Sequence, residues 1–311
     1  MLAIIQEITI WHWVSFVAVI LFFLALDLGV FHRAAHEVRF REALGWTILW
    51  FCVAMLFALG MGYWRGRESA LQFLAGYLIE LSLSMDNVFA IALIFAFFGI
   101  PSKFQHRILF WGIVGALLMR GIMIGAGAAL VQRFHAVLYV FGAFLIYSGI
   151  KMAMAKNEKV HPENNIILRL AQKFFPITNE LHGQKFLVKT DGRRALTPLA
   201  VALLMVETTD LVFAVDSIPA IFAVTRDAFI VFTSNVFAIL GLRSLYFVLV
   251  GAMRYFRFLK TGLAVILIFI GMKMLVEHWY KMPVDISLAV VGGIILMAMA
   301  ASVIFGVKKA K

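Results

Sequence analysis

The chain has 311 residues, of which 63% are hydrophobic and 14% are charged, and its mean hydropathy is +0.95. Soluble domains carry about a quarter charged residues, and runs of about 20 apolar residues predict membrane spans. These values exclude a soluble globular domain and predict a polytopic protein embedded in a lipid bilayer. The net charge of +11 does not indicate a nucleic-acid partner, because most of the excess lies in alternate loops. Cys52 is the single cysteine, which excludes a disulfide framework and a cysteine metal cluster.

Apolar segments recur along the whole chain. The first begins at Trp11 and follows no basic segment, so we expect a retained helix and no cleaved signal peptide. The predicted fold class is all-α, a single transmembrane helix bundle over residues 1–311 with about nine helices. In chain order the predicted helices are 10–31, 44–63, 70–98, 108–131, 134–154, 197–224, 228–249, 260–279 and 285–307.

Basic residues favour one side of this bundle. The loops after the odd-numbered helices carry most of the Lys and Arg, which predicts a cytoplasmic C-terminus and an N-terminus outside the cytoplasm. The long polar connection, 155–196, then becomes a cytoplasmic loop. We expect an amphipathic helix near Ile166–Phe175, ended by Pro176, and a hairpin around Asp191-Gly192. The favoured interpretation is a folded loop on the membrane surface, and the alternative is a regulatory segment that binds a protein partner.

Carboxylates interrupt two of the predicted spans. An ionised side chain at the centre of a spanning helix costs roughly 2.5–3.5 kcal/mol. Such a cost predicts an offsetting positive charge, most simply a transported cation. The five acids are Glu80, Asp86, Glu207, Asp210 and Asp216.

The two acidic spans belong to a predicted internal repeat. Asp86-Asn-Val-Phe-Ala-Ile matches Asp210-Leu-Val-Phe-Ala-Val, Arg120 follows Asp86 by 34 residues, and Arg243 follows Asp210 by 33. Repeat A (70–154) and repeat B (197–279) would cross the membrane in opposite senses. Inverted repeats of three helices are typical of secondary transporters that bind substrate at the midplane.

Helical periodicity separates the acids. Glu80 shares a face with Ser84 and Asn87, whereas Asp86 points to the opposite face. Glu207 and Asp210 share a face with Ser217, and Asp216 points away. The five acids therefore form two sites, or the helices unwind locally. Pro219 favours unwinding, because it cannot donate a hydrogen bond to the carbonyl of Val215.

These spans offer oxygen ligands to a metal. Neutral oxygens accompany the acids, and this chemistry favours Mn²⁺, Mg²⁺ or Ca²⁺ over Cu or Zn. The alternative is that the acids pair with Arg120, Arg243, Lys151 or Lys273 and only hold the bundle together. Arg120 and Arg243 are interpreted mainly as counter-charges that stabilise the site when it is metal-free, and the alternative is a packing role. Asp27 is either an entry ligand, part of a proton path, or a snorkelling acid. The neutral oxygens are those of Ser82, Ser84, Asn87, Thr208, Thr209 and Ser217.

Four sequence strings resemble the TerC family, and within it the Alx-type manganese exporters. They are Glu80-Leu-Ser-Leu-Ser-Met-Asp-Asn-Val-Phe-Ala, Thr197-Pro-Leu, Glu207-Thr-Thr-Asp-Leu-Val-Phe-Ala-Val-Asp-Ser-Ile-Pro-Ala, and Thr233-Ser-Asn-Val-Phe-Ala-Ile-Leu-Gly-Leu-Arg-Ser-Leu-Tyr-Phe. The likeness spans roughly residues 10–305. It implies a multi-pass protein of the bacterial inner membrane, with a periplasmic N-terminus, that exports Mn²⁺ through the five acids.

We therefore expect a secondary transporter that moves Mn²⁺ out of the cytosol, coupled to protons, with no enzymatic activity and no resident cofactor. An exporter of another divalent cation, such as Ca²⁺, is one alternative. A membrane scaffold that assists insertion or metal loading of exported proteins is another, supported by the basic loop 155–196. An intramembrane aspartyl protease is the third, although the Gly-x-Gly-Asp arrangement expected of that class is missing.

Overall fold

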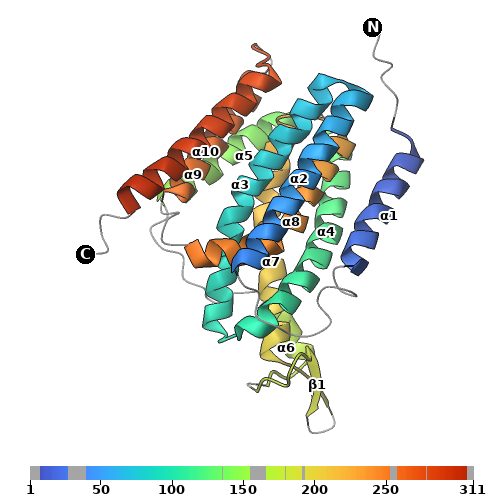
Figure 1. The fold of residues 1–311 in the computed structure, drawn as a ribbon, viewed down its shortest axis with the longest axis vertical. Helices are drawn as coiled ribbons and strands as arrows, with labels where there is room; N and C mark the ends of the chain where they lie inside the picture. The colour runs from blue at the N-terminus through green and yellow to red at the C-terminus, as the bar shows by residue number, and fades with distance from the viewer. Residues whose placement is uncertain are drawn as a thin grey trace.

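The computed structural model describes residues 8–26, 40–134, 136–154, 166–178, 180–190, 193–252, 258–277 and 279–306. These ranges form ten helices and one two-stranded sheet (Figure 1). The predicted polytopic helix bundle is confirmed, because eight helices are long and apolar enough to cross a membrane. They are α2 (Phe40–Arg65), α3 (Arg67–Phe97), α4 (Ser102–Arg133), α5 (Ala136–Met154), α7 (Pro198–Phe222), α8 (Ala228–Ala252), α9 (Leu259–Val276) and α10 (Val284–Gly306).

The helix ends differ from the predicted ones by a few residues. Helix α2 begins at Phe40 instead of 44, and α4 begins at Ser102 instead of 108. The prediction followed hydropathy, whereas a helix continues through polar residues where its end meets headgroups and water. Helix α1 (Ile10–Leu26) is apolar but shorter than the eight spans. The remainder of the predicted first helix lies outside the described residues.

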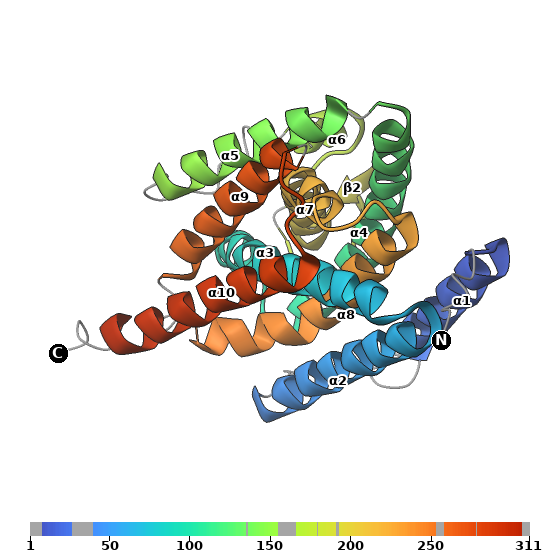
Figure 2. The same ribbon diagram turned by 90° about the horizontal axis from the view of Figure 1, so that it is seen from above.

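Two pairs of helices flank the centre of the bundle. Figure 2 shows α5 beside α9 on one side and α1 with α2 on another. Helices α3, α4, α7 and α8 pack against one another between them, and α8 is the most completely buried of the eight spans. Repeat A corresponds to α3–α5 and repeat B to α7–α9. The inverted relation between these triplets remains a prediction.

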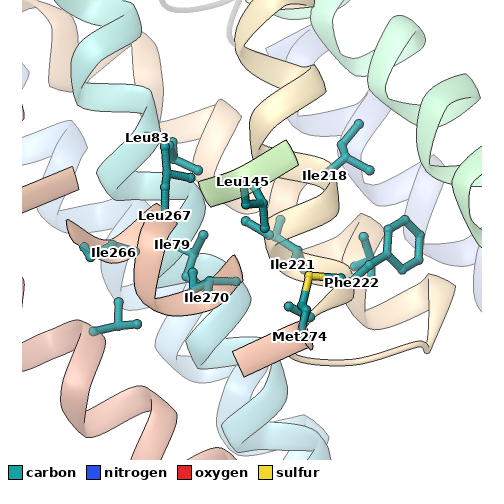
Figure 3. Packing of buried hydrophobic residues seen from close by; sticks show 14 of the residues in the cluster. Ile79, Leu83, Leu145, Ile218, Ile221, Phe222, Ile266, Leu267, Ile270 and Met274 are labelled. Carbon is teal, nitrogen blue, oxygen red and sulfur yellow. The ribbon is translucent and has the colours of Figure 1, made fainter. Parts of the chain in front are cut away.

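Apolar side chains fill the space between α3, α5, α7 and α9. Figure 3 shows Leu145 of α5 surrounded by apolar side chains of three other helices. They are Ile79 and Leu83 of α3, Ile218, Ile221 and Phe222 of α7, and Leu267 and Ile270 of α9. Burying each such side chain contributes about 1.5–3 kcal/mol relative to water. In lipid this difference shrinks, so close packing contributes most of the gain.

The contact between α5 and α9 depends on glycines. A Cβ atom at Gly271 would lie 2.6 Å from the carbonyl oxygen of Gly142, and one at Gly149 would lie 2.8 Å from that of Ala264. The two helix backbones therefore touch directly, as small residues allow in membrane helix pairs.

Replacing Gly271 by alanine should separate these two helices. Two of the three nearest atoms, the carbonyl oxygen of Gly142 and the nitrogen of Ile146, belong to the backbone and cannot rotate away. We expect a loss of about 1–3 kcal/mol, the usual cost of overpacking, read as a lower midpoint of thermal unfolding in detergent. Gly293→Ala in α10 is the control, because nothing lies within 4 Å of its added methyl group. Equal midpoints for the two variants would contradict the close contact.

Pro219 does not unwind α7. The helix runs from Pro198 to Phe222 with Pro219 inside it, so the prediction of local unwinding is wrong. Ile218, Ile221 and Phe222 are buried against α3, α5 and α9, and this packing holds the turn around the proline. Neighbouring helices commonly compensate a proline in a membrane span in this way.

The helix and the two hairpin strands predicted within 155–196 are confirmed, and the predicted turn at Asp191-Gly192 lies outside the described residues. Helix α6 (Ile166–Phe174) is followed by strands β1 (Leu187–Thr190) and β2 (Arg193–Leu196), which pair antiparallel. Figure 1 shows α6 and the hairpin beyond one end of the bundle. Leu168 of α6 is buried among residues of α3, α4 and α7, and Thr197 caps α7 while donating to the carbonyl of Lys185.

Candidate functional site

Arg120 of α4 lies at the centre of a buried polar cluster. Its side chain is 3% exposed. Nε and Nη2 donate to the two carboxylate oxygens of Asp210 at 3.1 and 2.8 Å, and Nη1 donates to Oε1 of Glu80. Glu80 comes from α3 and Asp210 from α7, so one guanidinium joins acids from both halves of the chain. A buried arrangement of this kind requires that every charge is paired, since each isolated charge would be costly.

Two asparagines complete this cluster. Asn87 Nδ2 donates to Asp210 Oδ1 at 2.8 Å, and Asn235 Nδ2 donates to Glu80 Oε2 at 3.0 Å. Asn235 Oδ1 and Ser217 Oγ accept longer bonds from Arg120 Nη1, at 3.3 and 3.4 Å. Each carboxylate is thus held by one amide and the shared guanidinium. We call the set Glu80, Asn87, Arg120, Asp210, Ser217 and Asn235 the central cluster.

Asn235 was not among the predicted site residues. The tetrapeptide Asn-Val-Phe-Ala occurs both at 87–90 and at 235–238, which is a signal that the sequence carries. It marks an asparagine that contacts one of the two acids in each case. The amides matter chemically, because an Asn side chain offers a carbonyl oxygen as well as donors.

The five predicted acids do not meet at one point. Among the described residues, no three Asp, Glu, His or Cys side chains lie close enough together to hold a metal ion. Asp86 is half-buried, and Asp216 accepts a 2.6 Å hydrogen bond from Ser148 of α5. Glu207 lies against Gly115 of α4. The separate facings predicted for Asp86 and Asp216 follow from regular helices, and the ligand roles of all five acids remain predictions.

The supporting residues fall into different places. Ser217 belongs to the central cluster, whereas Thr208 donates to the carbonyl of Leu204 in its own helix at 2.7 Å. Ser84 Oγ is buried with no hydrogen-bond partner among the described residues, as is Asn87 Oδ1. Each of these two oxygens can still accept a hydrogen bond or bind a cation. Asp27 lies outside the described residues.

A small hollow reaches the central cluster. Asn87 and Asp210 form its polar end, together with Arg243 of α8. The apolar wall comes from the halves of α3, α4, α7 and α8 nearest the 155–196 segment, so the hollow lies toward that end of the bundle. Its lining residues there are Ile91, Leu109, Gly112, Ile113, Ala116, Val206 and Leu242.

The central cluster has an unbalanced charge when its acids are ionised. Two carboxylates face one guanidinium, which leaves one negative charge in a buried site. Glu207 lies one helical turn before Asp210 and adds a second, and Arg243 at the polar end of the hollow offsets one of the two. A site of this sign, with carboxylate, amide and hydroxyl oxygens, suits a hard cation better than an anion.

Comparisons with known proteins agree with this architecture. A family described as "Integral membrane protein TerC family" matches residues 65–310. The "Uncharacterized membrane protein STKORF319" of Myxococcus xanthus is 51% identical over 292 residues, which cover 94% of this chain and 92% of the relative. Proteins named "Putative membrane-bound redox modulator Alx" are 45% identical in Salmonella typhi and 43% in Escherichia coli K12. These two alignments cover 92% of each chain.

No solved structure matches the chain. The family match covers well over half of the residues, and the relatives align along nearly the full length. The quoted motif strings of both acidic spans fall within the matched region. This chain is therefore a member of the TerC family of integral membrane proteins.

Proposed function

We propose that this protein is a secondary transporter that exports Mn²⁺ from the cytosol through the central cluster. One observation carries the proposal: buried Glu80 and Asp210, from different helices, converge on Arg120, and Asp210 lines the end of a hollow. Ionisable groups inside a membrane protein that face a cavity usually mark an ion pathway. Membership of the TerC family agrees with a membrane transporter.

Arg120 supports the proposal as a built-in counter-charge. When no cargo is bound, its guanidinium neutralises the two acids and satisfies their oxygens. An entering cation would compete with it for the same carboxylates. A divalent ion competes better than a monovalent one, because its attraction to each carboxylate is twice as large. Arg120 would thereby favour divalent cargo and keep the empty site stable.

The hollow supports loading from one side. It meets the central cluster at Asn87 and Asp210, and it lies toward the end of the bundle that carries α6 and the hairpin. The charge distribution of the loops predicts that this end is cytoplasmic. A cation arriving from the cytosol would first meet the unpaired Oδ1 of Asn87 and then the carboxylate of Asp210. Release on the other side would need the opposite access, which an inverted repeat provides by exchanging the two halves.

Protons are the natural coupling ion. Protonation neutralises a carboxylate and removes its attraction for a cation, so the same acids can carry either cargo in turn. Inward proton flow would then drive cation export. This coupling requires a membrane that maintains a proton gradient, as the bacterial inner membrane does.

Flux in proteoliposomes tests the proposal. Protein reconstituted into vesicles under an imposed proton gradient should move Mn²⁺ well above protein-free vesicles. Mg²⁺, Ca²⁺ and Zn²⁺ are assayed in parallel. If Ca²⁺ moves faster than Mn²⁺, the exported cation is calcium instead of manganese. Mn²⁺ flux at the level of empty vesicles would overturn the proposal.

A scaffold for metal loading or insertion of exported proteins is the second candidate. The observation that favours it is the folded segment between α5 and α7, whose hairpin is fixed by Arg107 through a 2.7 Å bond to Gln184 and through contact with Phe186. If the protein is a scaffold, deleting residues 166–190 should abolish co-purification of translocation machinery without changing Mn²⁺ flux. Flux is measured only on folded protein, because Leu168 packs this segment against the bundle. If the deletion variant loses Mn²⁺ flux but still co-purifies with the same proteins, transport is favoured over a scaffold. Proteolysis is a weaker candidate, because Arg120 separates the two acids that a protease dyad would need to share a proton.

A further inference from the structure

One position on α4 is shaped to receive a carboxylate. A Cβ atom at Gly115 would overlap Cδ and both carboxylate oxygens of Glu207. Other glycines of the same helix differ: a Cβ at Gly112 would make an ordinary 3.4 Å contact with Val206, and one at Gly125 would have open space. The carboxylate of Glu207 therefore rests on the bare Cα of Gly115, where α4 packs against α7.

Glu207 has ligand capacity that it does not use in this position. Its Oε2 is buried and has no hydrogen-bond partner among the described residues. Both oxygens of Glu80 and both oxygens of Asp210, in contrast, accept from Arg120 or an asparagine. A buried carboxylate oxygen without a donor costs free energy. Glu207 consequently gains when a cation, or a proton, comes within reach.

Its position brings such a cation within reach. Glu207 precedes Asp210 by one helical turn, and its neighbour Val206 lines the hollow. On the facing helix, Gly112 and Ala116 line the same hollow on either side of Gly115 along the chain. Because Glu207 and Asp210 are one turn apart on the same helix, a change of side-chain rotamer would turn the Glu207 carboxylate from α4 toward Asp210. Without a cation the two acids would repel each other there, and with one they would share it.

We propose that Gly115 is a positioning residue for the transport cycle. Its missing side chain provides the seat on which the Glu207 carboxylate rests when no cation is bound. Glu207 leaves this seat to complete the ligand set of a divalent cation beside Asp210, and returns when the cation departs. This inference rests on the proposed function and adds to it the element that separates loading from release.

Gly115→Ala removes the seat and tests the inference. The added methyl group forces Glu207 toward Asp210, so the liganded arrangement is formed in advance and a cation binds with less rearrangement. We expect the Kd for Mn²⁺, measured by calorimetry on the purified protein, to fall about fivefold or more. Maximal Mn²⁺ flux in proteoliposomes should fall as well, because release now returns Glu207 to a crowded position. A general loss of structure would instead weaken binding.

Two variants separate this effect from a packing defect. Gly125→Ala lies on the same helix in open space and should change neither Kd nor flux. In the Glu207→Gln background, replacing Gly115 by alanine should leave Kd unchanged. The double variant has already lost the carboxylate through which position 115 acts. If Gly115→Ala is not recovered folded, Gly115→Ala/Glu207→Asp should be, because the shorter acid relieves the overlap. Failure of both to fold would overturn the inference.

The outcomes distinguish the two proposals. A wild-type protein that neither binds nor moves Mn²⁺ overturns the proposed function together with the seat. Wild-type flux combined with an unchanged or raised Kd in Gly115→Ala overturns the seat alone. The seat is also overturned if Gly115→Ala shifts the Kd for Mn²⁺ as much in the Glu207→Gln background as in the wild type.

Discussion

Arg120→Met should lower the free energy of unfolding by about 3–5 kcal/mol, the usual cost of removing one partner from a buried ion pair. The variant leaves Glu80 and Asp210 buried with only the neutral donors Asn235, Asn87 and Ser217. Both acids would then have to be desolvated as ions without a counter-charge, or bind protons. Thermal or denaturant unfolding in detergent, followed by circular dichroism, measures this loss.

Two comparisons make the result specific. Arg226→Met removes an exposed ion pair with Glu277, which should cost only about 0–1 kcal/mol. The triple variant Arg120→Met/Glu80→Gln/Asp210→Asn removes the charges of the cluster together and should regain most of the stability, because neutral groups need no counter-ion. If the triple variant is as unstable as Arg120→Met, then Arg120 acts through packing and the charge argument fails.

Neutralising either acid should abolish transport while leaving the fold intact. In Glu80→Gln the guanidinium still pairs with Asp210, and in Asp210→Asn it still pairs with Glu80. Each variant therefore keeps one positive charge opposite one negative charge inside the membrane. The surplus negative charge that attracts a cation is gone, so we expect Mn²⁺ flux to fall about a hundredfold, which corresponds to about 2.7 kcal/mol.

Initial rates of Mn²⁺ flux in proteoliposomes measure this effect. Glu68→Gln is the matched control, because Glu68 is an exposed acid of the same helix as Glu80. It should transport at the wild-type rate. Unfolding midpoints close to that of the wild type would show that the lost flux is not lost structure. Full flux in both Glu80→Gln and Asp210→Asn would contradict a transport role for the central cluster.

The contrast between these two experiments follows from charge balance. Removing the single cation of the cluster strands two buried acids, whereas removing one acid leaves a balanced pair. Stability should therefore depend most on Arg120, and transport most on Glu80 and Asp210. The same side chains carry both properties, and the variants separate them.

The sequence alone determined the class of the protein and the local arrangement of its acids. Hydropathy predicted the spans. The 3.6-residue period placed Glu80 with Ser84 and Asn87, placed Asp210 with Glu207 and Ser217, and turned Asp216 away. Four of these six residues are buried in the central cluster, whereas the Ser84 hydroxyl makes no hydrogen bond among the described residues, Glu207 lies against Gly115, and Asp216 contacts α5. Turn chemistry and amphipathicity likewise predicted the hairpin and α6. These features depend on neighbours within about one or two turns of chain, which a sequence displays directly.

Only the tertiary structure decided which groups meet. Arg120 is 40 residues from Glu80 and 90 from Asp210, so its choice of partners depends on how α3, α4 and α7 are rotated and spaced. The contacts of Asn235 with Glu80 and of Glu207 with Gly115 depend on helix packing in the same way. Pro219 illustrates the limit from the other direction, because packing against neighbouring helices held a turn that the local sequence favoured breaking. Periodicity fixes which face of a helix a side chain occupies, but the partner across that face is set by the packing of the whole bundle.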